Sequence, residues 1–127
     1  MHKILVVEDV AMIRDLYAAA LRKAGYAVVC AADGAEALAL LDPFRPDLVL
    51  LDLELPEIDG PAFLRVMRGL SDFARTPVAV LSEQANERLV EKVAALGVQA
   101  NLLKSEISLD DLLVIVGWLL ATSRAAA

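Results

Sequence analysis

The chain has 127 residues, of which 58% are hydrophobic, and it carries a formal net charge of −6. This length suits one domain with its own core, and the acidic balance, without any cluster of Lys or Arg, argues against binding of nucleic acid. The single cysteine, Cys30, excludes an internal disulfide, and no Cys or His residues have the spacing of zinc ligands.

The chain begins with a predicted strand followed by a predicted helix. The apolar run Lys3–Val7 predicts the strand, which ends at two acids, Glu8 and Asp9. Apolar residues then recur at helical spacing, and Gly25 follows them at the C′ position of the helix. The predicted apolar stripe of this helix comprises Ile13, Leu16, Tyr17, Ala20, Leu21 and Ala24. The next predicted elements are a strand over Ala27–Ala31, a turn at Asp33-Gly34, a helix over Ala35–Leu41 and a connection bracketed by Pro43 and Pro46.

The stretch Asp47–Gly60 joins a buried strand to a loop. Its residues Leu48–Leu51 are all apolar, which is typical of a strand buried on both faces of a parallel sheet. The run ends at Asp52, and a proline and an Asp-Gly pair then predict a loop over Leu53–Asp59. Asp52 is therefore expected at the carboxyl end of a central strand, where open α/β sheets place their ligand sites.

The second half of the chain repeats the alternation of helices and strands. The predicted elements are a helix that begins at Gly60-Pro61, a strand over Val78–Leu81, a helix over Asn86–Leu96, a strand over Val98–Leu103 and a helix from Ser108 to about Ala121. Ser108 is the expected cap of the last helix, and two acids in its first turn favour the helix dipole. We expect residues 1–122 to form one domain and residues 123–127 to be a frayed tail or the start of a linker.

Five alternations of strand and helix predict an α/β fold of the (βα)5 type. Such a chain forms one five-stranded parallel sheet with helices on both faces, which is a three-layer sandwich with right-handed crossovers. The flavodoxin-like strand order 2-1-3-4-5 is the natural candidate at five strands, although the alternation alone does not settle the order.

In that order, four strand ends bring polar side chains to one edge of the sheet. They are Glu8 with Asp9, Asp52, Ser82 and Lys104, each the first polar position after an apolar run. Three neighbouring carboxylates raise one another's pKa, and a divalent cation relieves the repulsion. Mg²⁺ takes carboxylate oxygens, waters and a phosphate oxygen, while a lysine supplies a point charge for phosphate. This set suits phosphoryl transfer to a carboxylate, with Asp52 as the nucleophile.

The chain resembles the receiver domain of two-component response regulators over nearly its whole length. The resemblance rests on Ile4-Leu5-Val6-Val7-Glu8-Asp9, on Asp52 with Pro56 and Asp59-Gly60 at the family's spacing, on Ser82 after Val78–Leu81, and on Lys104. It implies that Asp52 accepts a phosphoryl group from a phosphohistidine on a histidine kinase or a histidine phosphotransfer protein.

The resemblance also implies the roles of the surrounding residues. Glu8, Asp9 and Asp52 would hold Mg²⁺ together with the backbone carbonyl of Glu54, while Ser82 would hydrogen-bond the phosphoryl group and Lys104 would pair with it. Members of the family also catalyse their own dephosphorylation by an in-line water. We therefore expect no enzymatic activity beyond this self-phosphorylation and self-dephosphorylation.

Four positions depart from the family pattern. Ser105 stands where the family usually has a proline after a cis peptide bond, and a cis bond before a non-proline residue is costly, so the bond after Lys104 is predicted to be trans or strained. Asn101 occupies the aromatic switch position, so burial of a ring cannot be the output. Glu83 replaces a small residue, and Glu54 adds an acid near the path of the attacking water. We expect altered rates of phosphoryl transfer and hydrolysis.

The last helix is unusually apolar. Its core stripe is predicted to comprise Leu109, Leu112, Leu113, Val116, Leu119 and Leu120. Val114, Ile115 and Trp118 extend the apolar surface, which is either a wide buried stripe or an exposed face that binds a partner or a second copy. In the family, the face formed by the fourth helix, fifth strand and fifth helix is commonly the output or dimer face. We therefore expect a downstream protein target or a dimer to use the Asn86–Leu96 and Ser108–Ala121 helices.

Two rival functions remain open. A degenerate receiver that acts as a phosphorylation-independent interaction module is motivated by Ser105, Asn101 and Glu83, although the complete acidic set argues against it. A small phosphatase of the haloacid dehalogenase type is suggested by the acid pair Asp52 and Glu54, but that family normally has Asp at the second position. No glycine-rich dinucleotide or P-loop motif occurs.

Neither end of the chain predicts a membrane segment. The apolar run after Lys3 is only Ile4–Val7, which is too short for a signal peptide. The uncharged run Leu112–Ser123 is shorter than the roughly 20 apolar residues that span a bilayer. We expect a soluble cytoplasmic protein without membrane contact.

Overall fold

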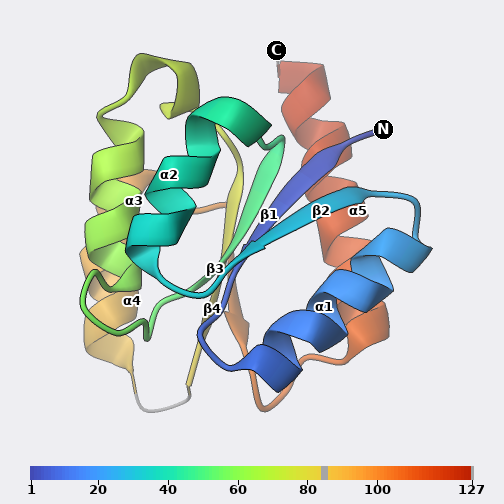
Figure 1. Cartoon of the computed structure of the whole chain (residues 1–127), viewed down its shortest axis with the longest axis horizontal. Helices are drawn as coiled ribbons and strands as arrows, with labels where there is room; N and C mark the ends of the chain where they lie inside the picture. Colours follow the sequence, from blue (N-terminus) through green and yellow to red (C-terminus); the bar gives the residue numbers. More distant parts are fainter. Residues whose placement is uncertain (84–85, 127) are drawn as a thin grey trace.

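One parallel sheet of five strands lies between two layers of helices (Figure 1). The computed structural model describes residues 1–83 and 86–126, with side chains as far as Ser123. The strands are β1 (Lys3–Val7), β2 (Ala27–Ala31), β3 (Leu48–Asp52), β4 (Val78–Ser82) and β5 (Ala100–Leu103). They lie in the order β2-β1-β3-β4-β5, which confirms the predicted topology.

A hydrophobic core lies between each face of the sheet and the helices that cover it. The helices are α1 (Ala11–Lys23), α2 (Gly34–Phe44), α3 (Gly60–Arg68), α4 (Glu87–Val93) and α5 (Leu109–Ala126), with 3-10 turns η1 (Ser71–Phe73) and η2 (Ala94–Leu96). α2, α3 and α4 cover one face of the sheet, and α1 and α5 cover the other (Figure 1). All five residues of β3 are buried, as the continuous apolar run predicted. None of the helices in the described part is long and apolar enough to cross a membrane.

Local side-chain bonds fix where the helices begin. The Asp33 carboxylate accepts from the Glu36 N–H at 2.8 Å, and the Asp59 carboxylate accepts from the Ala62 N–H at 2.9 Å. The Ser108 hydroxyl accepts from the Asp111 N–H at 3.0 Å, as predicted for the last helix. Each cap of this kind contributes about 1 kcal/mol to the stability of its helix.

Gly60 allows the loop after β3 to fold back against the strand. A Cβ at this position would lie 2.5 Å from the Leu53 Cα and 2.8 Å from the Asp52 carbonyl oxygen. The Gly60 N–H donates to the Leu53 carbonyl at 3.1 Å. The close approach therefore fixes the backbone immediately after Asp52, and only glycine fits there without a shift.

Several predicted boundaries were wrong. Pro43 lies in the last turn of α2 rather than in a connection, because Phe44 packs against the core and keeps that turn helical. Leu16 in α1 is 52% exposed, and Ala24, the residue after the end of α1, is also exposed, so the buried stripe is narrower than predicted. β5 begins at Ala100 rather than Val98, and α5 continues past Ala121 to Ala126. The assignment of residues 123–127 to a frayed tail or the start of a linker stays a prediction. The prediction for Ala127 lies outside the described residues.

Candidate functional site

The carboxyl ends of the strands bring the predicted acids together. Glu8 follows β1, and Asp52 is the last residue of β3. These two strands are neighbours, with Val7 paired to Leu51, so Glu8 and Asp52 lie side by side at the edge of the sheet. Both side chains are buried. The parallel register of two apolar strands therefore places two carboxylates where water is largely excluded.

Lys104 joins these two carboxylates. Its Nζ donates to Glu8 Oε1 at 2.8 Å and to Asp52 Oδ2 at 3.0 Å. The three side chains are 12%, 0% and 1% exposed, respectively. The backbone N–H of Lys104 donates to the Ser82 carbonyl at 3.0 Å, which ties the segment after β5 to the end of β4. The described residues contain no cis peptide bond, so Lys104 reaches the site with a trans bond to Ser105.

Three carboxylates at this edge form a candidate metal centre. Glu8, Asp9 and Asp52 each offer an oxygen, and these oxygens lie within 4.8 Å of one another. Asp9 is exposed, whereas the other two are buried, so the cluster is open to solvent on one side. A donor set made only of carboxylate oxygens with room for water fits a hard cation such as Mg²⁺.

The remaining predicted residues surround this cluster. The Glu54 N–H donates to Asp52 Oδ1 at 2.9 Å, and Ser82 is buried at the end of β4. The metal-binding role of the Glu54 carbonyl and the phosphoryl-binding role of Ser82 stay predictions. Arg14 also contacts the site but was not predicted to do so: its guanidinium donates to the Glu8 carbonyl at 3.0 Å. A bond from a helical side chain to a neighbouring backbone carbonyl has no signature in the spacing of residues.

The ionisation of the site is shifted by burial and by the neighbouring charges. Burial, followed by the hydrogen bond with Asp52, raises the pKa of Glu8 from 4.5 to about 8, although Lys104 acts in the opposite direction. Burial acts to lower the pKa of Lys104, but its hydrogen bonds to Glu8 and Asp52 outweigh burial, and the pKa is raised. Lys104 therefore stays charged, and the site without a cation favours a proton on Glu8 near neutral pH.

The raised pKa of Glu8 predicts that the metal-free protein loses stability as the pH rises. A carboxyl group that holds its proton more tightly in the folded state stabilises the fold below its unfolded pKa, and this contribution is lost as the pH rises through the folded pKa. Between the ordinary value of 4.5 and about 8, we expect the free energy of unfolding to fall by on the order of 4 kcal/mol.

Urea denaturation in EDTA at pH 5 and pH 8 measures this loss. In Glu8→Gln the side chain stays neutral, and the change between the two pH values is expected to shrink. Added Mg²⁺ favours the ionised carboxylate and is expected to reduce the loss in the wild type. Equal pH dependence in the two proteins would contradict the assignment to Glu8.

Comparisons with known proteins agree with this geometry. The sequence model of the family described as "Response regulator receiver domain" matches residues 4–116. The Regulator of RpoS of Escherichia coli (strain K12) is 39% identical over 102 residues, which are 80% of this chain and 30% of that protein. The response regulator MprA of Mycobacterium tuberculosis (strain H37Rv) is 35% identical over 123 residues, which are 96% of this chain and 52% of that protein. The chain therefore spans less than two thirds of the length of the curated relatives it matches.

Solved structures show the same fold. The chemotaxis response regulator CheY4 of Vibrio cholerae superimposes with a TM-score of 0.85 at 31% identity, over 94% of this chain and 98% of that chain. A CheY-like receiver domain from Methanospirillum hungatei has a TM-score of 0.92 at 24% identity over 100% of this chain and 99% of that chain, which supports the fold alone. With a family match over residues 4–116, the chain belongs to the response regulator receiver domain family.

Proposed function

We propose that this receiver domain is a cytoplasmic phosphoacceptor in which Asp52 takes a phosphoryl group from a histidine kinase or a histidine phosphotransfer protein. The observation that carries the proposal is the Lys104 ammonium held between Asp52 and Glu8, at 3.0 Å and 2.8 Å, inside a cluster of three carboxylates. A buried cation beside a buried carboxylate stabilises negative charge that arrives on that carboxylate. The phosphorylation state would then control contacts with other proteins.

The transfer follows from the position of Asp52. One carboxylate oxygen attacks the phosphorus of phosphohistidine, a new P–O bond forms, and the P–N bond breaks with its electron pair moving to the imidazole nitrogen. Glu8, Asp9, Asp52 and the backbone carbonyl of Glu54 would hold Mg²⁺, which supplies positive charge for the phosphoryl oxygens when it is bound.

Other side chains hold the acceptor and the phosphoryl group in position. The Glu54 N–H fixes one oxygen of Asp52. Ser82 would hydrogen-bond the phosphoryl group, and Lys104 would balance its charge. Water would later attack the phosphorus in line with the P–O bond to Asp52. That bond would break, releasing inorganic phosphate and regenerating the Asp52 carboxylate. Beyond these reactions on its own side chain, we propose no enzymatic turnover.

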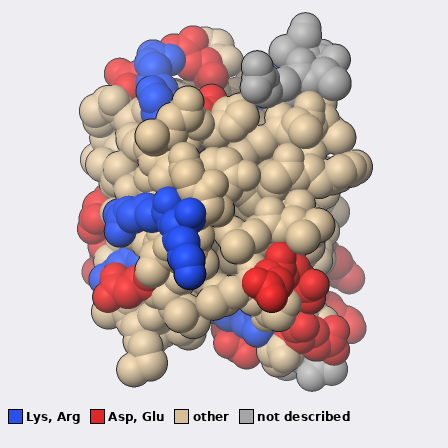
Figure 2. Space-filling model, turned by 90° about the vertical axis from the view of Figure 1, so that its right-hand side faces the viewer, with Lys and Arg blue, Asp and Glu red and all other residues tan. Residues whose placement is uncertain are grey.

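An apolar surface beside the site suits the phosphoryl donor. Val10, Met12 and Leu16 are exposed at the start of α1, directly after the two acids. The side of the molecule that α1 and α5 form carries a broad uncharged area with a small group of basic side chains (Figure 2). Exposed apolar patches of this kind mark protein-binding surfaces. We infer that the donor protein contacts the start of α1.

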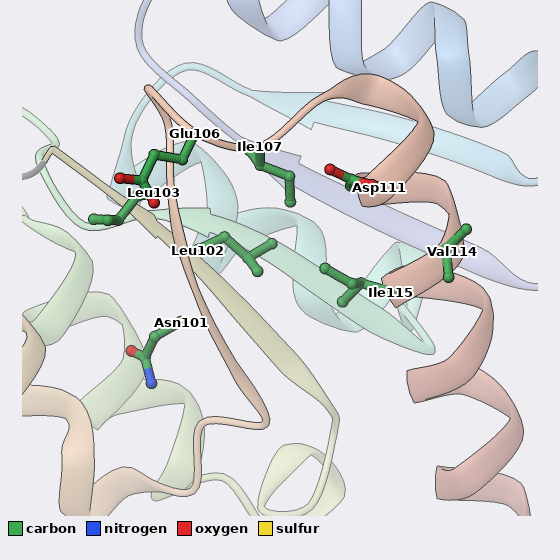
Figure 3. A pocket seen from close by; sticks show the side chains of 8 residues that line it. All are labelled: Asn101, Leu102, Leu103, Glu106, Ile107, Asp111, Val114 and Ile115. Carbon is green, nitrogen blue, oxygen red and sulfur yellow. The ribbon is translucent and has the colours of Figure 1, made fainter.

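A second surface suits the output. Val114 and Trp118 on α5 are 71% and 63% exposed, which favours the exposed-face interpretation of this helix. Beside them a surface pocket of about 420 Å³ opens between β5 and α5 (Figure 3). Its lining comprises Asn101, Leu102, Leu103, Glu106, Ile107, Asp111, Val114 and Ile115. We propose that a downstream protein or a second copy binds here, on the side of the Asn86–Leu96 and Ser108–Ala121 helices.

Incubation with acetyl phosphate tests the phosphoacceptor function. With Mg²⁺, intact mass spectrometry is expected to show the gain of one phosphoryl group. In EDTA the adduct is expected to disappear, because no divalent cation then offsets the negative charge of the acidic cluster and of the donor. Size-exclusion chromatography with light scattering, with and without beryllofluoride, reports any change of assembly.

The degenerate interaction module makes the opposite prediction. It requires that neither the mass nor the assembly changes in Mg²⁺ with either reagent. Multiple turnover of a phosphate ester by the protein would instead favour a phosphatase.

A further inference from the structure

The hydrogen-bond ladder between β3 and β4 changes partners just beyond Asp52. The Leu53 N–H donates to the Leu81 carbonyl at 3.0 Å, as a regular parallel ladder requires. The next bond of such a ladder would run from the Glu83 N–H to the Leu53 carbonyl. Instead, the Leu53 carbonyl accepts from the Gly60 N–H at 3.1 Å, and the Glu83 N–H donates to Oε1 of Glu54 at 2.9 Å. A carboxylate has taken the place of a backbone acceptor.

Glu54 therefore contacts both sides of the site. Its N–H donates to Asp52 Oδ1 at 2.9 Å, and its carboxylate holds the backbone directly after Ser82. Glu54 is half-buried, so its charge is only partly screened by solvent. A charged acceptor makes a stronger hydrogen bond than the carbonyl it replaces, but it also responds to any new charge nearby.

We propose that the Glu54 carboxylate is a charge-sensitive link that positions the Glu83 backbone directly after β4 and is displaced when Asp52 is phosphorylated. The inference rests on the proposed function of Asp52. A phosphoryl group on Asp52 adds negative charge beside an existing carboxylate, and like charges repel strongly at a partly buried site. Displacement leaves the Glu83 N–H without its present acceptor. The backbone at Glu83, directly after β4, thereby senses the state of Asp52 without an aromatic switch residue.

The first experiment measures the link without phosphorylation. Hydrogen exchange of the Glu83 amide, followed by NMR in EDTA, is compared among the wild type, Glu54→Ala and Glu54→Gln. Loss of the acceptor in Glu54→Ala is expected to speed the exchange about tenfold, whereas the amide oxygen of Glu54→Gln is expected to keep it within about twofold of the wild type. Equal exchange in Glu54→Ala and the wild type would overturn the link.

The second experiment measures how the charge of Glu54 affects the phosphorylation of Asp52. Both Glu54 variants are expected to react with acetyl phosphate about tenfold faster than the wild type, because the opposing carboxylate is gone. Glu57→Gln is the matched control, since it removes an exposed acid from the same loop, and its rate is expected to stay within about twofold of the wild type. If Glu57→Gln and Glu54→Gln increased the reaction rate equally, the net charge of the protein would explain the effect, and the specific role of Glu54 would be overturned.

A crystal structure with Mg²⁺ and beryllofluoride gives the decisive geometry. The distance from Glu54 Oε1 to the Glu83 nitrogen is expected to exceed hydrogen-bonding range, and persistence of the bond would overturn the proposal. Failure of the proposed function has a different signature, because wild-type protein would then form no acetyl phosphate adduct and bind no beryllofluoride.

Discussion

The Asp52→Asn variant is expected to form no phosphoryl adduct under conditions that fully modify the wild type with acetyl phosphate and Mg²⁺. An amide is not a nucleophile toward phosphorus, and among the three carboxylates of the cluster only Asp52 accepts the hydrogen bond from the Glu54 N–H. The substitution is expected to preserve the local fold. In the wild type the Glu54 N–H donates to Asp52 Oδ1 at 2.9 Å, and the amide oxygen of Asn can accept the same hydrogen bond. Loss of the adduct would therefore report chemistry rather than unfolding.

Stability measurements on the same variant show whether lost chemistry or unfolding explains the missing adduct. In the wild type, two buried carboxylates share one ammonium group, whereas Asp52→Asn leaves one carboxylate for Lys104. We expect the metal-free variant to be more stable than the wild type by about 1 kcal/mol, since reactive sites commonly retain groups that destabilise the fold. Urea denaturation in EDTA measures the difference, and a strongly destabilised variant would contradict this account.

The matched control is Asp15→Asn, which removes one exposed carboxylate from α1. Its adduct is expected to form at the wild-type rate. An adduct on Asp52→Asn of the same yield as on the control would show that another side chain of the cluster, Glu8 or Asp9, is the acceptor.

The sequence predicted the topology of the site because the relevant signals are local. Each strand is an apolar run that stops at a polar residue, and parallel strands bring their carboxyl ends to one edge. Glu8, Asp52 and Lys104 could therefore be expected together before any coordinates, and the structure places them in hydrogen-bonding contact. The order of the strands followed from the fold class rather than from any single residue.

Features that depend on packing between elements could not be predicted in this way. Leu16 is exposed although it falls on the apolar stripe. The helical period gives the spacing of apolar residues but not how the helix is oriented on the sheet. Ser105 left open whether the bond after Lys104 is trans or strained, and the trans bond found there is a feature that the spacing of residues does not report. The bond from Glu83 to Glu54 joins side chain to backbone across 29 residues of sequence, so no motif reports it.

Replacement of Lys104 by Met is expected to destabilise the metal-free protein by about 3 kcal/mol, because it leaves the buried acid pair, Glu8 and Asp52, without its cation. The Lys104 side chain is only 12% exposed, so water cannot easily replace the lost charge. Mg²⁺ is expected to recover most of the loss, since a cation bound by Glu8, Asp9 and Asp52 neutralises the same carboxylates. Urea denaturation with EDTA and with Mg²⁺ measures both effects.

The same substitution separates the structural and chemical roles of Lys104. With Mg²⁺ present the variant should fold, yet its reaction with acetyl phosphate should slow by at least about tenfold, because the positive charge that faces the phosphoryl oxygens is gone. Lys92→Met on the exposed face of α4 is the matched control and is expected to leave both stability and rate unchanged. If Mg²⁺ failed to restore stability, the cation would not be binding where the three carboxylates meet. If the rate stayed at the wild-type value in the folded variant, Lys104 would serve only to hold the metal-free site together, and the phosphoryl charge would have to be balanced by other groups.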